Sequence, residues 1–361
     1  MRILHLIDSL GGGGAERQLA YLAGGLVERG HEVHVLSLDG GPHRARLVEK
    51  GVVLHLGRLR PRLLLLGDLS RAIARVDPEV VQTWLELMNA VGGCAARLGR
   101  RPWIYSERNL PEKELGWRAT VRHLIAGGAD AVVANSESGA RSWRTALGGA
   151  RAKRVTVIPN ALALDELDRA PPARPEALGL LPDAEVVLFA GRLVPQKNLA
   201  LLAPALLRVL ARRPRAVALV CGEGELEKWL KSELSRGGVA DRCRFFGYRA
   251  DLWSLMKLAS VLVSTSRYEG RPNVVAEAMA CGCPLALSDI PEHHELVPKD
   301  AALFFPDDET AAANAIAQIL DDPAGAKRRA ERAAERVRGH SIDRLAREYE
   351  AIYRAVLAAR S

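Results

Sequence analysis

The chain has 361 residues, of which 48% are hydrophobic and 26% are charged, a composition typical of globular rather than disordered proteins. No apolar run approaches the roughly 18 residues that a membrane-spanning helix needs, and an odd number of cysteines, five, argues against a disulfide scaffold. The net charge is +8, and residues 1–165 carry most of it, with 23 Lys and Arg against 16 Asp and Glu.

These bounds indicate two domains in a reducing compartment. The length exceeds one ordinary hydrophobic core and fits two α/β domains. The apolar stretch at the N-terminus is short and stops at Asp8, so we expect no signal peptide and a cytoplasmic protein. The basic first half predicts an anionic partner: a membrane surface, a nucleic acid or a charged substrate.

Short apolar runs alternate with amphipathic ones through the first half. The runs predict strands at 2–7, 32–38, 52–56, 80–84, 103–106, 130–135 and 154–159. Helical patterns lie between them, as at 16–30, where Gly30 suits a cap. This alternation predicts a parallel sheet with helices on both faces. The Pro-rich stretch at 167–185 is predicted to be a linker.

The same plan restarts after the linker. Strands are predicted at 185–191, 215–222, 242–247, 261–266, 284–288 and 301–305. A long amphipathic helix follows at 341–360, with Ser341 as its N-cap. We therefore expect an α/β fold of two Rossmann-like domains, 1–165 and 166–340, then a C-terminal helix at 341–361. The cleft between the domains is the expected site.

The first stretch with chemical potential is the Gly-rich turn IDSLGGGGAERQL at 7–19. Glycines let backbone N–H groups approach an anion, and a helix N-terminus adds partial positive charge. A tight turn without a ligand is one alternative. A dinucleotide-binding turn is another; Gly11 and Gly13 fit its spacing, but Glu16 stands where its third glycine belongs.

The second stretch is FAGRLVPQKNLALL at 189–202, where a strand ends at Gly191 and a helix starts near Asn198. Arg192 and Lys197 flank the turn between them. Two cations at a strand's carboxyl end, beside a helix N-terminus, suit a diphosphate. The alternative is two solvated surface cations.

The third stretch is YEGRPNVVAEAMACGCP at 268–284, which predicts a loop and then a helix after a buried strand. Pro272 suits the first helical position, and Gly282 suits the left-handed residue past the helix end. Two acids, Glu269 in the loop and Glu277 in the helix, have seven residues between them.

These acids suit hydroxyl groups of a ligand. Glu277, held rigidly in the helix, can accept two hydrogen bonds from a vicinal diol such as that of ribose, and Glu269 can meet hydroxyls nearer the reacting centre. The backbone N–H groups of Gly270, Asn273 and Val274 can face an anionic group. The alternative is a helix with two ordinary exposed acids near its start.

Together the three stretches favour one ligand, a sugar joined through a diphosphate to a nucleoside. The sequence resembles the retaining glycosyltransferases of family four, which have the GT-B fold. The resemblance rests on GGAER at 13–17, GRLVPQKN at 191–198 and the two acids within EGRPNVVAEAMACGCP; VIPNAL (157–162), GEGEL (222–226) and SDIPEHHELV (288–297) are further landmarks. It extends over nearly the whole chain.

The resemblance implies roles for these residues. Arg192 and Lys197 would hold the diphosphate, Glu277 the ribose hydroxyls and Glu269 the transferred sugar. The Gly13–Gly14 loop would close over the donor from the other domain. The resemblance also implies that the C-terminal helix crosses back to the first domain, and that no metal or other cofactor is needed, because cations and a helix N-terminus can stabilise a departing diphosphate.

The sequence departs from this family on the acceptor side. Many relatives carry a His at the end of the fifth strand, where this chain has Ser106, Glu107 and Arg108, and another is often found near Leu87. Glu107 is a candidate for contact with the sugar; a structural acid paired with Arg108 is the alternative. One residue of the His293–His294 pair either reaches the cleft or is an ordinary packed or solvated side chain.

We therefore expect a retaining transferase that moves a hexose or N-acetylhexosamine from a nucleotide diphosphate sugar to an acceptor hydroxyl. Attack from the leaving-group face is favoured, since no second carboxylate is well placed as a covalent nucleophile. The alternatives are a non-catalytic nucleotide-sugar binder, a nucleotide-sugar epimerase and, more remotely, a dinucleotide-dependent oxidoreductase.

Basic and bulky apolar residues occur together at 57–66, 97–103 and 116–125, a composition that suits a protein lying on an anionic bilayer. The expected acceptor is thus a lipid-linked sugar or a growing envelope glycan, met at the inner face of the cell membrane. A solvated basic surface is the alternative. We expect no nucleic-acid partner, because no stacking platform or reading motif is evident.

Overall fold

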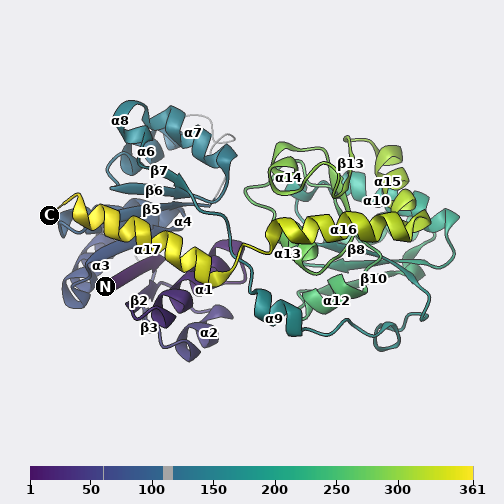
Figure 1. Cartoon of the computed structure of the whole chain (residues 1–361), viewed down its shortest axis with the longest axis horizontal. Coiled ribbons are helices and arrows are strands. Elements are labelled where there is room, and N and C mark those ends of the chain that lie inside the picture. The colour runs from purple at the N-terminus through teal and green to yellow at the C-terminus, as the bar shows by residue number, and fades with distance from the viewer. Residues whose placement is uncertain (60, 109–116, 361) are drawn as a thin grey trace. The chain divides into compact units, whose positions relative to one another are not determined.

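The computed structural model describes residues 1–59, 61–108 and 117–360. The chain divides into two compact units: unit 1 is residues 1–161 with 340–361, and unit 2 is residues 162–339. Each unit is a parallel sheet covered by helices, and the predicted α/β class is confirmed (Figure 1).

Unit 1 contains a sheet of seven parallel strands in the order β3-β2-β1-β4-β5-β6-β7. The strands are β1 (Arg2–Ile7), β2 (Glu32–Ser37), β3 (Val53–Leu56), β4 (Val80–Trp84), β5 (Trp103–Glu107), β6 (Ala131–Ala134) and β7 (Val155–Val157). Each occupies a predicted apolar run. Central parallel strands are buried on both faces, which is why the run at Ile3–Ile7 is wholly buried.

The connections of unit 1 are helical. They are α1 (Gly14–Glu28), α2 (His43–Glu49), α3 (Arg62–Val76), α4 (Leu85–Leu87), the π-helix η1 (Met88–Gly92), α5 (Gly93–Leu98), α6 (Trp117–Ala126), α7 (Glu137–Leu147) and α8 (Gly149–Ala152). Leu85 begins the α4–η1 segment with a left-handed φ of 65°. That conformation is uncommon for a branched side chain.

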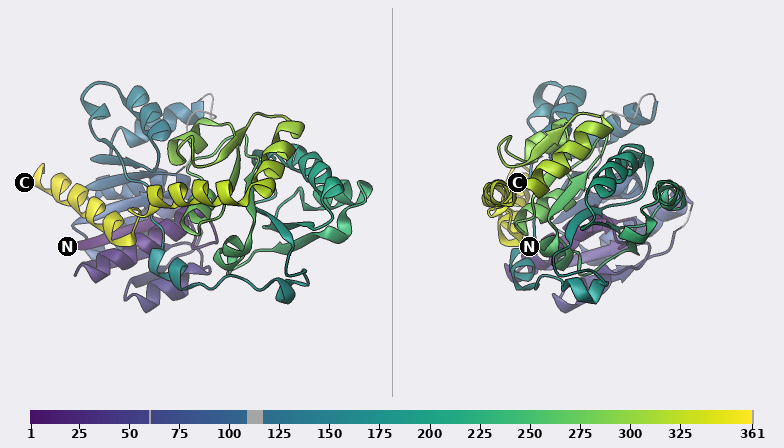
Figure 2. Two further views of the ribbon diagram at one scale, coloured as in Figure 1. Left: turned by 45° about the vertical axis from the view of Figure 1, so that its right-hand side comes forward. Right: turned by 90° about the vertical axis from the view of Figure 1, so that its right-hand side faces the viewer.

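The last helix of the chain, α17 (Ile342–Ala358), belongs to unit 1 and packs on α1; it is the yellow helix in Figures 1 and 2. The predicted N-cap is confirmed, since Ser341 Oγ accepts from the backbone N–H of Arg344 at 3.2 Å. Gly25 permits the close approach, because a Cβ there would lie 3.1 Å from that of Ala346. Buried Tyr353 also donates a hydrogen bond to Gln82 of β4.

Unit 2 contains a sheet of six parallel strands in the order β10-β9-β8-β11-β12-β13. They are β8 (Glu185–Ala190), β9 (Ala216–Cys221), β10 (Cys243–Gly247), β11 (Val261–Ser264), β12 (Leu285–Ser288) and β13 (Leu303–Phe305). The helices are α9 (Leu164–Arg169), η3 (Pro175–Leu178), η4 (Pro195–Lys197), α10 (Leu199–Arg212), α11 (Glu227–Arg236), η5 (Ala240–Arg242), α12 (Leu252–Leu258), α13 (Asn273–Ala280), α14 (Pro291–Leu296), α15 (Glu309–Asp321) and α16 (Pro323–Val337).

The predicted linker is not a free connection. Its first residues complete α9, and Lys257 of α12 donates to the carbonyl oxygens of Leu167 at 2.7 Å and Ala170 at 2.6 Å. The proline-rich composition predicted irregular backbone, but an ammonium group with three donors fixes that backbone to unit 2.

Glycines let the strand ends of unit 2 approach one another closely. Gly191 after β8 and Gly222 after β9 have φ of 154° and 133°. A Cβ on Gly222 would lie 2.0 Å from the carbonyl oxygen of Gly191, so only glycine fits there. Gly282 has the predicted left-handed φ, 70°. Pro272 is not the first helical residue as predicted, because its ψ of 84° places it just before α13.

Candidate active site

The carboxyl-terminal edge of the unit 2 sheet brings together Lys197 and Glu269, which are far apart in sequence. Strands β8 and β11 pair side by side, so the loops that follow them meet. Lys197 Nζ lies 2.5 Å from Glu269 Oε1, and their side chains are only 16% and 8% exposed. Ser266 Oγ donates to the same carboxylate oxygen at 2.6 Å. The two residues therefore form a largely buried ion pair, not two solvated surface charges.

Hydrogen bonds between the two loops hold this pair in place. Gln196 Nε2 donates to the Tyr268 carbonyl oxygen at 2.9 Å, and the Arg267 N–H donates to the Gln196 carbonyl oxygen at 3.0 Å. Thr265 Oγ1 donates to the Lys197 carbonyl oxygen at 2.8 Å. Such fixed backbone limits how far the charged side chains can reorient.

Arg192 differs from Lys197 in its surroundings. It directly follows Gly191 at the end of β8, and its side chain is exposed. The Lys197 stem packs over Gly191 instead, because a Cβ on that glycine would lie 3.2 Å from Lys197 Cε. The strand end thus carries one cation fixed by a carboxylate and one that extends into solvent.

The second predicted acid, Glu277, lies in α13 and is 3% exposed. The indole of Trp253 in α12 donates to Glu277 Oε2 at 3.1 Å. The predicted alternative of two exposed acids is therefore wrong for both Glu269 and Glu277, since both are buried. Asn273 and Val274 form the first turn of α13, where backbone N–H groups have no intrahelical acceptor, and Gly270 lies in the loop before it.

His293 is a packed residue at this edge of the sheet. It is fully buried in α14, and its Nδ1 lies 2.8 Å from the Ser288 carbonyl oxygen. Burial lowers the pKa of His293 from 6.5 to about 4, so the ring is neutral at physiological pH. His294 instead pairs with Asp289, with Nε2 2.5 Å from Oδ1.

At the corresponding edge of unit 1, a carboxylate lies against the Gly-rich turn. Gly13 is the N-cap of α1, and a Cβ there would lie 2.3 Å from Glu16 Oε2. Gly14 is the first residue of α1. Asp8, at the end of β1, accepts from the Met88 N–H at 3.0 Å, and burial raises its pKa to about 6. This turn therefore presents acidic side chains beside its backbone donors.

Glu107, the last residue of β5, and Arg108, which follows it, have different surroundings. Glu107 is 4% exposed, and Trp143 Nε1 donates to its Oε2 at 2.6 Å. Arg108 donates to Asn160 Oδ1 and to the Tyr349 hydroxyl, both at 2.7 Å. The two residues thus have different partners: Trp143 donates to Glu107, whereas Arg108 contacts α17 and the segment after β7. Contact of Glu107 with a sugar stays a prediction.

In two of the three basic apolar segments of unit 1, 97–103 and 116–125, side chains pack against other parts of the protein, which weakens the prediction that these segments contact a membrane. Trp103 is 1% exposed and belongs to the core. The Arg122 guanidinium lies 5.6 Å from the ring centroid of Trp143. The side chains of Trp117 and Arg118 lie outside the described residues, as does Arg60. Segment 57–66 still fits the predicted membrane contact, because Leu59, Leu63 and Leu64 are exposed by 73%, 85% and 57%.

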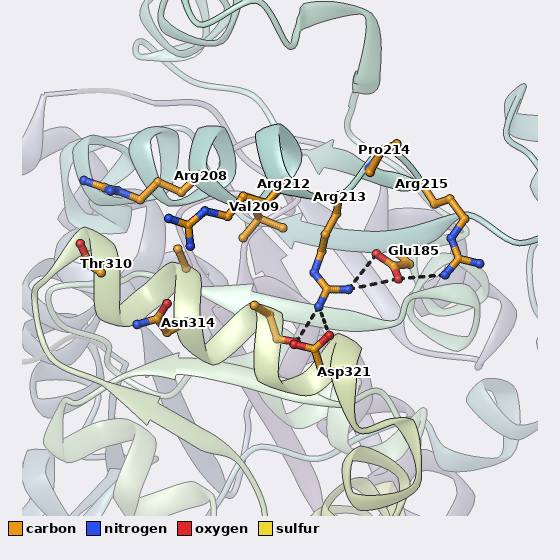
Figure 3. A pocket seen from close by; sticks show the side chains of 12 residues that line it. Glu185, Arg208, Val209, Arg212, Arg213, Pro214, Arg215, Thr310, Asn314 and Asp321 are labelled. Carbon is orange, nitrogen blue, oxygen red and sulfur yellow. Dashed lines mark hydrogen bonds and ion pairs between the residues drawn. The ribbon is translucent and has the colours of Figure 1, made fainter.

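A cavity of about 410 Å³ lies elsewhere in unit 2, at the starts of β8 and β9, and is lined by four arginines (Figure 3). Three of these arginines, Arg208, Arg213 and Arg215, already form ion pairs with protein carboxylates. Arg213 pairs with Glu185 at 3.2 Å and with Asp321, and Arg215 pairs with Asp183 at 3.4 Å. We interpret this groove as a surface ion-pair network at the edge opposite the candidate site.

Sequence reasoning missed the side chains that hold the two acids. Gln196 lies within the second stretch and Ser266 at the end of the predicted strand before the third, but neither carries a signal of its own, and Trp253 occurs in an ordinary amphipathic helix. Only the folded chain shows that each contacts a predicted acid or its loop.

Among residues 1–59, 61–108 and 117–360, no group of three His, Cys, Asp or Glu side chains is arranged to hold a metal ion. The five cysteines are unbridged, and burial raises the pKa of Cys221 and Cys281 to about 12. Within the same residues, no helix is both long and apolar enough to cross a membrane.

Two family descriptions match the chain. Residues 12–166 match Glycosyltransferase Family 4, and residues 173–337 match Glycosyl transferases group 1. The lipopolysaccharide core biosynthesis glycosyltransferase LpsD of Rhizobium meliloti is 27% identical over 333 residues, 90% of this chain and 89% of LpsD. The UDP-Gal:alpha-D-GlcNAc-diphosphoundecaprenol alpha-1,3-galactosyltransferase of Escherichia coli is 30% identical over 180 residues, 47% of this chain and 46% of that protein.

Two solved structures are similar over the whole chain. HepE from Anabaena, in complex with UDP-glucose, has a TM-score of 0.87 at 23% identity and covers 98% of this chain and 100% of its own. WaaG, a glycosyltransferase involved in lipopolysaccharide biosynthesis, has a TM-score of 0.77 at 14% identity and covers 98% and 99%. At identities of 23% and 14%, the structural similarity shows that this chain shares the fold of these two proteins.

Proposed function

Because the chain belongs to glycosyltransferase family four and has the GT-B fold, we propose that it is a retaining hexosyl- or N-acetylhexosaminyltransferase that uses a nucleotide diphosphate sugar. The observation that carries the proposal is the buried pair of Lys197 and Glu269 at a strand edge that also holds Glu277. One fixed cation and two desolvated acids suit a ligand that is anionic at its centre and rich in hydroxyls at both ends.

In this proposal the donor diphosphate binds Lys197 and Arg192, and Glu269 turns from the ammonium toward hydroxyls of the sugar. Glu277 accepts from the ribose diol. The complexes of HepE with UDP and UDP-glucose favour uridine as the base. The cations stabilise negative charge that grows on the leaving diphosphate as the sugar–oxygen bond breaks.

Retention of the anomer follows from attack on the leaving-group face. The acceptor oxygen bonds to the anomeric carbon as the bond to the diphosphate breaks, and the acceptor proton passes to the departing phosphate oxygen. In this complex Glu269 is a poor covalent nucleophile, because Ser266 donates to its carboxylate and hydroxyls of the sugar take up further acceptor positions. Product NMR with isotope-labelled donor tests the proposal, and an inverted anomer would overturn it.

The donor is identified by thermal stabilisation with a panel of nucleotide sugars. A ligand present at about 100 times its dissociation constant should stabilise the fold by roughly 2.7 kcal/mol. No stabilisation by any nucleotide sugar, together with no transfer from labelled donor, would overturn the enzyme assignment.

The proposed acceptor is a lipid-linked or cell-envelope glycan. It is favoured by LpsD, named for lipopolysaccharide core biosynthesis, and by the Escherichia coli relative, whose name includes a diphosphoundecaprenol acceptor. The exposed leucines of segment 57–66 lie beside exposed Arg58 and Arg62. Leucines that enter an interface and arginines that meet anionic headgroups suit peripheral contact with the inner face of the cell membrane.

Cosedimentation with vesicles tests this contact. Binding should rise with anionic lipid, fall with salt, and weaken when Arg58 and Arg62 are changed to Glu. The matched control is the same reversal at Arg328 and Arg338, two exposed arginines of unit 2. Equal recovery with neutral and anionic vesicles, or equal loss in both double variants, would contradict the assignment to segment 57–66.

A further inference from the structure

The two acids of the candidate site have chemically different partners. Glu269 faces a cation, the ammonium of Lys197 at 2.5 Å. Glu277 meets a neutral donor, the indole N–H of Trp253, at 3.1 Å. Both acids are buried, at 6% and 3% exposure, so the partner of each strongly affects what else its carboxylate can bind.

We propose that Trp253 is a positioning residue that sets nucleotide affinity by fixing the Glu277 carboxylate in the orientation that accepts a ribose diol. The inference rests on the proposed role of Glu277 in donor binding. Trp253 itself need not touch the nucleotide, because it acts through the carboxylate.

The chemistry of the indole supports this role. An ionised carboxylate offers about four acceptor positions. The indole N–H occupies one position on Oε2 and carries no charge that would compete with the ligand. A cation in its place would form an ion pair that neutral hydroxyl groups would have to displace. The indole therefore orients the Glu277 carboxylate without placing a charge of its own beside it.

The fold holds the indole firmly. Trp253 is half-buried and packs against the same apolar cluster as the residues around Glu277, including Val275 and Met279. Cys281, just past α13, lies with Sγ 3.8 Å from the Trp253 carbonyl oxygen. This packing keeps α12 and α13 together, so Nε1 stays within reach of the acid.

The start of α12 is fixed as well. Arg249 makes two hydrogen bonds to the Asp251 carboxylate, at 2.7 and 2.6 Å, and its guanidinium lies 5.1 Å from the centre of the Phe246 ring. Asp251 is the residue before α12, so these contacts anchor the turn from which Trp253 projects. A tryptophan on an anchored turn can orient a carboxylate without moving itself.

The test compares ribose with a nucleotide that lacks the diol. UDP and 2′,3′-dideoxy-UDP are titrated by calorimetry into the parent, Trp253→Phe, Glu277→Gln and Trp229→Phe. The control residue, Trp229 of α11, is the other tryptophan of unit 2 and is 37% exposed. The dideoxy ligand serves as the check of folding, since a misfolded variant loses both ligands.

We expect Trp253→Phe to weaken UDP binding about 10-fold, the loss typical of a hydrogen bond to a charged group. Binding of the dideoxy analogue should be nearly unchanged, because that ligand has no diol for Glu277. Glu277→Gln should show the same selectivity, and Trp229→Phe should match the parent with both ligands. In turnover assays, KM for the donor should rise in Trp253→Phe while kcat stays within about twofold.

Three results would overturn the inference, and they differ in what they say of the function. If Glu277→Gln loses the preference for UDP and Trp253→Phe keeps it, Trp253 is merely structural and the donor assignment stands. If the parent binds both ligands equally, Glu277 does not bind ribose. If the parent does not bind UDP, the proposed donor fails and the inference with it.

Discussion

Removal of the charge of Lys197 is the most informative perturbation of the candidate site. Lys197→Met keeps the length of the side chain and leaves Glu269 without its cation. Glu269→Gln does the converse, and the double variant removes both charges. Because the pair is largely buried, the one charge that remains in each single variant is costly. The losses of unfolding free energy in the two single variants should therefore add up to more than the loss in the double variant.

The magnitude follows from the geometry. Two unit charges about 3 Å apart attract by roughly 5 kcal/mol at an effective dielectric constant of about 20. Desolvation of both groups and the partial exposure of Lys197 reduce that value, and Ser266 still donates to Glu269 after the lysine is lost. We expect each single change to destabilise by about 1–3 kcal/mol and a coupling energy of about 1–3 kcal/mol.

Denaturant unfolding of the four proteins measures this coupling, and labelled-donor assays measure turnover. The control cycle is Lys231→Met with Glu227→Gln, an exposed pair within α11 whose coupling should be about 0.3–0.5 kcal/mol. All three site variants should lose on the order of 100-fold or more in turnover, the double included. Coupling no larger than that of the control, or near-parental turnover in Lys197→Met, would refute the reasoning.

Three further predictions concern stability. Burial raises the pKa of Asp8 to about 6, so the folded state loses stability as pH rises through that value. Asp8→Asn should therefore raise the free energy of unfolding by about 1 kcal/mol at pH 7.5 but change it little at pH 4. A denaturant midpoint that does not rise at pH 7.5 would contradict this. The pKa of His293 is lowered from 6.5 to about 4, so the ring stays neutral when folded, and the stability of the protein should fall as pH drops from 6.5 toward 4. His293→Asn should make the free energy of unfolding depend less on pH in this range. An unchanged pH dependence counts against this prediction. Ser341→Ala removes the cap of α17 and should cost about 1 kcal/mol, seen as faster amide exchange in α17, whereas Ser341→Asp should exchange like the parent.

Much of the fold was predictable because buried parallel strands consist of continuous runs of apolar residues. Each strand of both sheets lies in such a run, and ends differ by one or two residues because strands fray where pairing stops. The linker was mispredicted at its start. Its tie to unit 2 depends on Lys257, and nothing in the composition of 167–185 indicates which distant lysine will approach it.

The acids and the lysine of the candidate site were predicted, whereas the side chains that orient them were not. Spacing within one motif fixes Glu269 and Glu277 relative to the same strand and helix. The contacts of Lys197 with Glu269 and of Trp253 with Glu277 cross 72 and 24 residues, and only the strand order brings them together. The basic apolar segments show a related limit, because the sequence placed Trp103 both in the predicted strand at 103–106 and in the membrane-facing segment 97–103, and only its 1% exposure assigns it to the core.

The assignment of α17 to unit 1 has a consequence for synthesis on the ribosome. The sheet of unit 1 is complete by residue 161, but the helix that packs on α1 follows all of unit 2 in the chain. At about 5–20 residues per second, the ribosome needs on the order of 10–40 s to make the intervening segment. During that interval the surface of α1 around Gly25 lacks α17, and the Gln82 side chain lacks the hydrogen bond from Tyr353. Unit 2, which is continuous in sequence, therefore acquires all its elements before unit 1 does.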